Sequence, residues 1–386
     1  MHKLIKLLTI YSVLITKDLL ITSHYLNASD GHVPYFASLP FGIGPLFDFP
    51  VEWWYYAGYA KTENNTDVSI LIMVTRFGTS DEVYSIVEYG IGYNEFYKGS
   101  SNLGTNFSFD KNYPVKNGIT MSIPSLTNYY LLFEDNDTTV KCELTHGKIG
   151  VKNSLHTIYF KNNNILLNLT VNDQYGAIFE GHNGYIANNS IDFGFPKLSI
   201  IEGNIMMNNT ENKIISGNMW LDRQALSDTY NSNYVLYTGN WIYLDFENNN
   251  KYLFRYLWLP KVKDWQDTQW IIGPNSNAPP IKSYGFDLSN DNVVDMKDNE
   301  YSINILYYKS PNKSPHWKSP TSNITYGSAW IIQIYNNSYI IETVYNNAEI
   351  LTYPQSAFEG ALIIKSMNDT YLGNGFIEQM YNHKNK

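Results

Sequence analysis

Short apolar segments alternate with polar turns along nearly the whole chain. Segments such as "VSILIMVTRF", "TIYFKNNNILLNLTV" and "AWIIQIYNNSYIIETVY" are rich in Ile, Val, Tyr and Phe, and clusters of Asn, Gly and Asp separate them at roughly ten-residue intervals. The breaks "NNN" and "NNS" are typical of hairpin turns. Apolar residues do not recur at helical spacing over several clean turns. The pattern therefore predicts an all-β protein with antiparallel strands and little helix.

The segment "NWIYLDFENNNKYLFRYLW", residues 240–258, shows how these strands divide their side chains. Because successive side chains of a strand point to opposite faces, Trp241, Tyr243 and Asp245 should share one face. On the return strand, Arg255 should lie among leucines, opposite a row of aromatic residues. Both faces are hydrophobic, which is typical of a strand with a core on one side and a cavity or second sheet on the other.

The chain is longer than one compact core usually supports, since 386 residues favour two domains of ordinary size. The texture changes after about residue 225, where "LSDTYNSNYV" is polar and lacks a strand pattern. We predict an N-terminal domain over residues 29–225 and a C-terminal domain over residues 226–386.

Residues 1–28 are predicted to be a signal peptide and an N-terminal arm. "MHKLIKLLTIYSVLIT" has the basic start and short apolar core of a secretory signal; the alternative is a frayed N-terminal arm. No other stretch approaches the length needed to cross a bilayer, so we expect no stable membrane insertion. The predicted location is secreted or in the endomembrane lumen.

Potential glycosylation sites agree with secretion, although an asparagine-rich chain forms such triplets by chance. The asparagines that open an Asn-x-Ser/Thr triplet are Asn27, Asn64, Asn106, Asn136, Asn168, Asn188, Asn208, Asn312, Asn323, Asn336 and Asn368.

The composition of the chain limits the partners and cofactors that can be expected. Charged residues make up only 16% of the chain, Tyr occurs 33 times, and the formal net charge is -9. The lysines are scattered singly, so nucleic acid is not expected as a partner. Cys142 is the only cysteine, which excludes an internal disulfide and a cysteine-based zinc site. No histidine has a partner at ligand spacing, and we predict neither a metal nor a cofactor.

The stretch "EWWYYAGYA" places one carboxylate beside four aromatic rings. Strand alternation puts Glu52 on the same face as Trp54 and Tyr56. Glu52 is either an acid or base in a pocket or a buried, paired structural carboxylate. The rings, Trp53 and Tyr55 included, either bind a ligand or simply fill the core.

Five motifs in a shared order resemble the carotenoid 1,2-hydratase (hydroxyneurosporene synthase) family and its AttH-like relatives. They are "FPVEWWYYAGYA", "GFPKLSIIEGNI", "SGNMWLDRQ", "HWKSPTSNITYGSAW" and "FEGALIIKSMNDTYLGNGFIEQMY", and they span most of the chain. The resemblance implies two lipocalin-like β-barrel or β-sandwich domains packed side by side. Glu359 and Glu378 fall within the last motif, and we assign them no role.

The resemblance implies that Asp222 occupies the position of the family's proposed catalytic acid. Trp220 stands where the hydratases have a tyrosine, Arg223 where the family usually has His, and Gln224 where it has Glu or Asn. These departures leave carotenoid hydration as such unsupported, and the ligand class is therefore taken more broadly as a polyene, isoprenoid or lipid-like molecule.

Hydrating or cyclising an alkene requires a proton donor and a pocket that holds a carbocation. An Asp buried among rings has a raised pKa because desolvation disfavours the anion, so it keeps a proton near neutral pH. Aromatic faces stabilise a cation by about 0.5–2 kcal/mol each. We predict Asp222 and Glu52 as catalytic groups. The expected ligand-binding residues are Trp53, Trp54, Tyr55, Tyr56, Trp220, Arg223 and Trp241.

Two functions and a third possibility remain open at this point, the third being a secreted glycoprotein whose cavity is filled by its own rings and which would show no pocket of useful volume. The first is a cofactor-independent hydratase (hydro-lyase) or cyclase acting on a hydrophobic small molecule. The second is a carrier that holds a lipid-like ligand without changing it, as barrels of this size commonly do. An Asp222 carboxylate that faces a closed cavity favours the enzyme, whereas one that is exposed or locked to Arg255 or Arg223 favours the carrier.

Overall fold

The structure, a computed structural model, describes most of the chain from residue 39 onward. The described residues are 39, 43, 44, 46, 49, 51–78, 84–104, 106–108, 111, 112, 114–122, 125–179, 184–186, 190–226, 238–258, 271–272, 282–289, 293–305, 314–352 and 355–382. The predicted signal peptide lies outside these residues. Within them, no helix has both the length and the apolar character that crossing a membrane requires.

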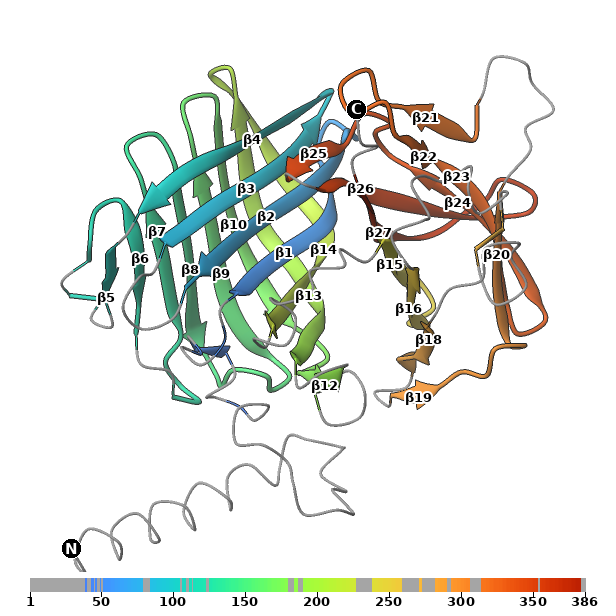
Figure 1. The fold of residues 1–386 in the computed structure, drawn as a ribbon, viewed down its shortest axis with the longest axis horizontal. Coiled ribbons are helices and arrows are strands. Elements are labelled where there is room, and N and C mark those ends of the chain that lie inside the picture. The colour runs from blue at the N-terminus through green and yellow to red at the C-terminus, as the bar shows by residue number, and fades with distance from the viewer. Residues whose placement is uncertain are drawn as a thin grey trace, which may run out of the picture.

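The described residues form two large curled sheets that lie side by side, and they contain no α-helix (Figure 1). The all-β prediction is therefore confirmed. The first sheet has 14 strands and the second has 11. The first sheet ends with β14 (Thr210–Leu226), and the second begins with β15 (Thr238–Phe246).

The first sheet is built from the N-terminal part of the chain. Its strands are β1 (Val51–Thr62), β2 (Asp67–Phe77), β3 (Tyr84–Tyr93), β4 (Glu95–Gly104), β5 (Asn106–Ser108), β6 (Gly118–Met121), β7 (Tyr130–Glu134), β8 (Thr139–His146), β9 (Ser154–Lys161), β10 (Ile165–Asp173), β11 (Ile178–Phe179), β12 (Tyr185–Ile186), β13 (Ser190–Met207) and β14. The order is β4-β3-β2-β1-β14-β13-β10-β9-β8-β7-β6-β5, with β11 and β12 pairing to β13. All pairs are antiparallel except β5 with β6.

The second sheet is built from the C-terminal part. Its strands are β15, β16 (Lys251–Trp258), β17 (Ile271–Ile272), β18 (Lys282–Asp287), β19 (Val294–Asp295), β20 (Tyr301–Ile305), β23 (Ala329–Ile334), β24 (Asn337–Thr343), β25 (Glu349–Thr352), β26 (Gln355–Ser366) and β27 (Tyr371–Asn382). The order is β17-β20-β23-β24-β26-β27-β15-β16-β18-β19, with β25 on β26. A separate two-stranded sheet pairs β21 (His316–Lys318) with β22 (Thr325–Gly327).

Side-chain alternation divides the buried apolar residues into three clusters. One fills the curl of the first sheet, and a second fills the curl of the second sheet. The third lies between the two sheets and takes side chains from both. The hairpin of β15 and β16 has the predicted faces, since Trp241 and Tyr243 belong to the cluster between the sheets and Ile242 to the second sheet's own core. We call the contact zone between the sheets the seam.

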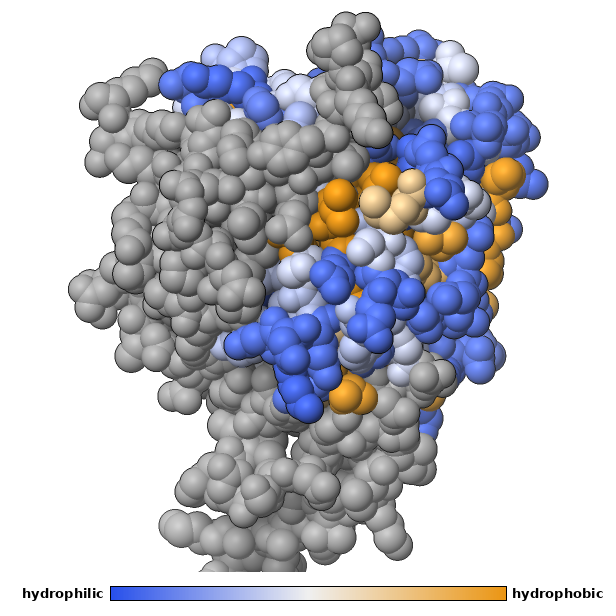
Figure 2. Space-filling view, turned by 90° about the vertical axis from the view of Figure 1, so that its right-hand side faces the viewer, coloured by the Kyte–Doolittle hydropathy of each residue, from blue (hydrophilic) through white to orange (hydrophobic). Residues whose placement is uncertain are grey.

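The outward side of the second sheet is mostly polar. Figure 2 shows this side of the molecule, where hydrophilic residues cover most of the described surface, and apolar residues form a group near its centre with smaller spots at the right edge and towards the base. Large apolar patches on a monomer usually indicate an interface, and the described surface in this view has no extended one. The apolar side chains of the strands are instead directed into the cores and the seam.

Candidate functional site

Strand β1 separates the predicted site residues into two groups. Trp54 and Tyr56 belong to the core inside the first sheet, whereas Tyr55 belongs to the seam cluster and Trp53 packs against it. The same alternation on β14 places Asp222, the cross-strand neighbour of Tyr55, on the seam side. The "EWWYYAGYA" stretch therefore serves two different environments at once.

Glu52 lies on the inner side and is held by two guanidinium groups. Arg76 donates from Nε to one carboxylate oxygen, and Arg223 donates from Nη2 to the other. The backbone N–H of Leu46 also donates to Glu52 Oε2 at 3.0 Å. All three charged side chains have zero exposed area. These contacts favour the structural alternative for Glu52, because a buried charge persists only when it is paired and hydrogen-bonded.

The group of Glu52, Arg76 and Arg223 also fixes the segment that precedes β1. Arg76 Nη2 donates to the carbonyl oxygens of Leu46 and Phe49 at 2.9 and 2.8 Å. Trp54 Nε1 donates to the carbonyl of Ile43 at 2.8 Å, and the Arg223 guanidinium lies 4.3 Å from the centre of the Trp54 ring. Trp54 and Arg223 thus support the chain locally.

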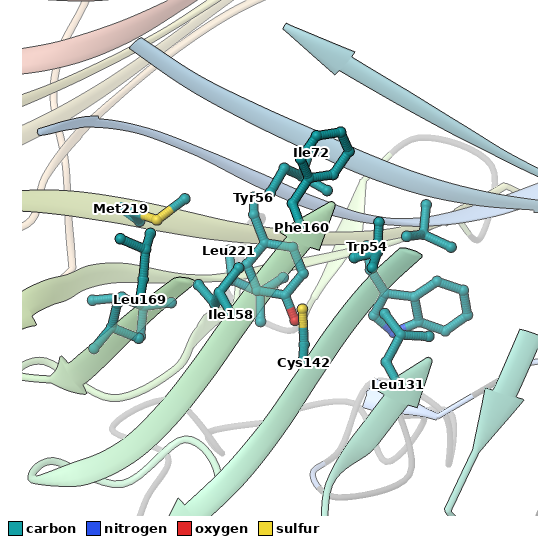
Figure 3. Packing of buried hydrophobic residues seen from close by; sticks show 14 of the residues in the cluster. Trp54, Tyr56, Ile72, Leu131, Cys142, Ile158, Phe160, Leu169, Met219 and Leu221 are labelled. Carbon is teal, nitrogen blue, oxygen red and sulfur yellow. The ribbon is translucent and has the colours of Figure 1, made fainter. Parts of the chain in front are cut away.

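The interior of the first sheet is packed with its own side chains. Figure 3 shows Trp54, Tyr56 and Cys142 among aliphatic residues from neighbouring strands. The hydroxyl groups of Tyr56 and Tyr129 are 2.8 Å apart and form a hydrogen bond. Burial raises the pKa of the Cys142 thiol to about 12, so this thiol stays protonated. The rings on this side are core residues.

The seam is lined with rings from both sheets. Trp220 lies 5.1 Å from Trp241 and 4.9 Å from Tyr243, measured between ring centroids. Tyr55 meets Trp241 and Phe376 edge-on at 6.4 and 6.2 Å. Such edge-to-face contacts are favourable for aromatic pairs. The structure thus brings Tyr55, Trp220 and Trp241 together, three of the residues predicted to bind a ligand.

Asp222 is placed within this aromatic zone. Its side chain is buried, with 5% relative exposure, and its Oδ1 accepts a hydrogen bond of 3.4 Å from Trp220 Nε1. Arg223 points to the opposite face, as strand alternation predicts, and there it binds Glu52. Arg255 donates to Asp192. The hydrogen bond from Trp220 places the Asp222 carboxyl beside a ring of the seam.

Two further carboxyl groups reach the seam from the second sheet. Glu359 on β26 and Glu378 on β27 are direct cross-strand neighbours and hydrogen-bond to each other. Tyr55 of the first sheet donates its hydroxyl to Glu359 Oε2 at 2.5 Å. A hydrogen bond between two carboxyl groups requires that one of them carry a proton. Burial, with the neighbouring carboxylate, raises the pKa of Glu359, and burial also raises that of Glu378.

A third glutamate and one guanidinium complete the charge pattern. Glu88 on β3 raises the pKa of Glu359 further, and burial raises its own pKa to about 7. Arg255 counteracts the rise at Glu378, but it also donates to Asp192, as does Gln224 Nε2 at 2.6 Å. Burial thus raises the pKa of all three glutamates, which favours protonated, neutral acids.

The sequence indicated only part of this site. The family motifs indicated Asp222 and Trp220, the aromatic stretch of β1 indicated its rings, and Arg255 was considered only as a partner of Asp222, whereas Glu88, Asp192, Glu359 and Glu378 were not assigned a role. Strand alternation places Arg255 among leucines, and the last motif contains both glutamates. These were the available signals, but neither states which faces of the two sheets meet.

Across the part of the chain that the structure describes, no group of three or more His, Cys, Asp or Glu side chains is arranged to hold a metal ion.

Comparison with solved structures identifies the fold. An AttH protein of Nitrosomonas europaea matches with a TM-score of 0.64 and 14% identity, covering 90% of this chain and 97% of that one. Kievitone hydratase of Nectria haematococca matches with a TM-score of 0.54 and 15% identity, covering 86% and 88%. CghA, in a complex with Sch210972, matches with a TM-score of 0.53 and 9% identity, covering 88% and 90%.

The chain thus has the AttH-like, two-domain lipocalin-like fold, and the structural side of the predicted resemblance is confirmed. No family model matches the chain, and no curated protein matches its sequence. The identities are low, so these likenesses define the fold, while the chemistry has to be argued from the seam.

Proposed function

We propose that this protein encloses a hydrophobic polyene, isoprenoid or similar alkene in the seam and promotes its hydration or cyclisation by proton transfer. The observation that carries the proposal is the buried Asp222 carboxyl on a ring-lined face, close to a second acid, the hydrogen-bonded Glu359–Glu378 pair. Kievitone hydratase has the same fold at low identity, and the hydration of an alkene is consistent with that likeness.

The acid has to hold a proton until the ligand arrives. Desolvation favours the neutral form of a buried carboxyl group, and a neighbouring carboxylate favours it further. Glu359 experiences both effects. Asp222 is the proposed donor to the ligand, and the Glu359–Glu378 pair, bonded to Tyr55, is a second group that holds a proton in the same space.

The reaction transfers one proton in each direction. The donor carboxyl gives its proton to one alkene carbon, which leaves the positive charge on the other. In hydration, a water oxygen bonds to that cation and returns a proton to the carboxylate. In cyclisation, a second double bond of the ligand attacks the cation, and a neighbouring C–H returns the proton. The rings of Trp220, Trp241 and Tyr55 stabilise the cation through their faces.

Access is proposed from the end of the seam at which Trp53 lies. Trp53 packs against the seam cluster but is only partly buried. Its cross-strand neighbour Gln224 pairs in turn with Asp192, so this row contains the polar Asp192–Arg255 contact. An apolar ligand entering there would meet the rings immediately behind this polar row.

The test compares wild type with Asp222→Asn, both purified from the organism's own cells and examined by native mass spectrometry and by analysis of their organic extracts. We expect a hydrated or cyclised product with wild type and accumulated substrate with the variant. Asp173→Asn is the matched control, because Asp173 is a buried carboxylate that caps a turn at Tyr175 and Gly176. The same unaltered ligand on wild type and Asp222→Asn would overturn the enzyme and establish the carrier.

We also propose that the chain is secreted. All sequon asparagines whose side chains the structure describes are exposed, which is what glycosylation in the secretory pathway requires. They are Asn64, Asn136, Asn168, Asn208, Asn323, Asn336 and Asn368. Treating the native protein with an endoglycosidase should lower its mass, and an unchanged mass together with a retained N-terminal segment would contradict secretion.

A further inference from the structure

We propose that a groove at the far end of the seam binds a neutral, polyhydroxylated molecule, that is, a mono- or disaccharide. The groove has a volume of about 450 Å³ and is lined by Tyr59, Lys61 and Asn218 from the first sheet and Glu247, Tyr371 and Asn374 from the second, with a short stretch of β14. Known ligand pockets have about 300–1,000 Å³, so the groove is large enough for one or two sugar rings.

The groove is separate from the acid site. Asn218, Trp220 and Asp222 follow one another at two-residue spacing on β14, and Asn374 and Glu378 are similarly related on β27. A row of buried rings, Trp220 among them, therefore separates the groove from the carboxyl groups. The proposed alkene chemistry and this groove do not share residues.

Hydrogen bonds to neighbouring side chains hold the lining residues of the first sheet in place. Asp67 Oδ1 accepts from the Tyr59 hydroxyl at 2.6 Å and from Lys61 Nζ at 2.9 Å. Asn218 donates to Asp245 at 2.8 Å and accepts from Ser199 at 2.8 Å. Side chains positioned in this way lose little conformational freedom when a ligand binds.

The charges favour a neutral ligand. Lys61 is already paired with Asp67, so an anionic ligand would have to displace that carboxylate. The carboxylate of Glu247 is exposed and has no hydrogen-bond or ion-pair partner among the described residues, and it repels anions as well. A cation would meet the Lys61 ammonium. Neutral hydroxyl groups fit both side chains, since a hydroxyl can donate a hydrogen bond to Glu247 and accept one from Lys61.

Tyr371 supplies the surface on which a sugar ring can stack. It is 40% exposed, and its hydroxyl is 3.5 Å from Asn374 Nδ2. The exposed ring offers an apolar face for C–H groups, and the amide and hydroxyl beside it offer donors and acceptors. A polyol that is apolar on one face and hydrogen-bonding at its rim matches this arrangement.

The test uses the full chain, treated with an endoglycosidase so that its own glycans cannot occupy the groove. Saturation-transfer NMR with a panel of mono- and disaccharides is compared with choline and with free amino acids. We expect at least one saccharide to bind, and Tyr371→Ala and Glu247→Gln each to weaken it about tenfold. Tyr335→Ala is the matched control, because Tyr335 is 38% exposed and lies outside the groove; it should change the affinity less than about twofold.

Three results would overturn the inference: no saccharide binds, a saccharide binds equally to Tyr371→Ala, or only choline or amino acids bind. Both substituted side chains are exposed, and unchanged thermal unfolding of the variants would show that the fold is intact. The outcome is independent of the alkene chemistry, which is followed through Asp222.

Discussion

The two sides of β1 contain the same kinds of residue in opposite charge balance. On the inner side, one carboxylate, Glu52, is shared by Arg76 and Arg223. On the seam side, the pKa values of Glu88, Glu359 and Glu378 are raised, and the Arg255 guanidinium that counteracts the rise at Glu378 also binds Asp192. A carboxylate between two guanidiniums stays ionised and holds structure together. Buried carboxyl groups whose pKa is raised keep their protons and are suited to acid chemistry.

The strongest test of this contrast is Glu52→Gln. Removing the carboxylate leaves two buried guanidiniums facing each other, so we expect the free energy of unfolding to fall by about 3–5 kcal/mol. Guanidinium chloride titration measures the change. Glu143→Gln is the control, because Glu143 pairs with the exposed Lys141 and should cost about 0–1 kcal/mol. Equal losses of unfolding free energy in the two variants would mean that the contacts of Glu52 with Arg76 and Arg223 do not support the fold.

The pH dependence of stability tests whether the acids of the seam are protonated in the folded protein. Burial raises the pKa of Glu88 from 4.5 to about 7, so the folded protein holds a proton that the unfolded chain releases above pH 4.5. The contribution of this proton to the free energy of unfolding is therefore fully present below pH 4.5. It declines by up to about 1.4 kcal/mol per pH unit as the pH rises towards 7, and it is absent above pH 7.

Glu88→Gln should remove this part of the slope, which thermal or urea unfolding between pH 4.5 and 7.5 would measure. Glu359 and Glu378 add slope in the same direction, because their pKa values are also raised. Replacing Glu359 or Glu378 by glutamine should reduce the slope of stability against pH that remains in Glu88→Gln. A wild-type stability that rises with pH over this interval would contradict the assignment of protonated seam acids.

The smallest effect is expected from single hydroxyl groups. Tyr55→Phe removes the hydrogen bond that joins the two sheets at Glu359 and should cost about 1–2 kcal/mol, because a buried acceptor loses its donor. Tyr59→Phe removes a bond within the first sheet, where Asp67 keeps Lys61, and about 0.5–1 kcal/mol is expected. Unfolding curves in urea compare the two, and a larger loss for Tyr59→Phe would show that the Tyr55 contact contributes little to holding the sheets together.

Much of the fold could be predicted because strand alternation is a local signal. It placed Glu52 with Trp54 and Tyr56, put Arg223 opposite Asp222, and separated the two faces of β15. The asparagine-rich breaks became turns, and Asn208, Asn209 and Asn249 indeed adopt positive φ, which asparagine tolerates better than most residues.

The candidate site could be predicted only in part, because alternation assigns faces but not the partners of those faces. Tyr55 and Glu359 are 304 residues apart in sequence, and nothing local indicates that their strands approach. The same limit applies to Arg255 and Asp192. Glu359 and Glu378 also looked like ordinary strand carboxylates, since their raised pKa values follow from cross-strand register and burial together.

The pairing of first strands with last ones has a consequence for how the chain folds. In the first sheet, β1 pairs with β14, joining Val51 to Leu226, and in the second, β15 pairs with β27, joining Gly239 to Met380. Contacts between such distant residues make folding slow. During synthesis, the outer edge of β1 has to wait until β14 leaves the ribosome, and an apolar strand edge left open for that time is prone to aggregate. The first sheet can be complete before the second is made, so the seam forms last.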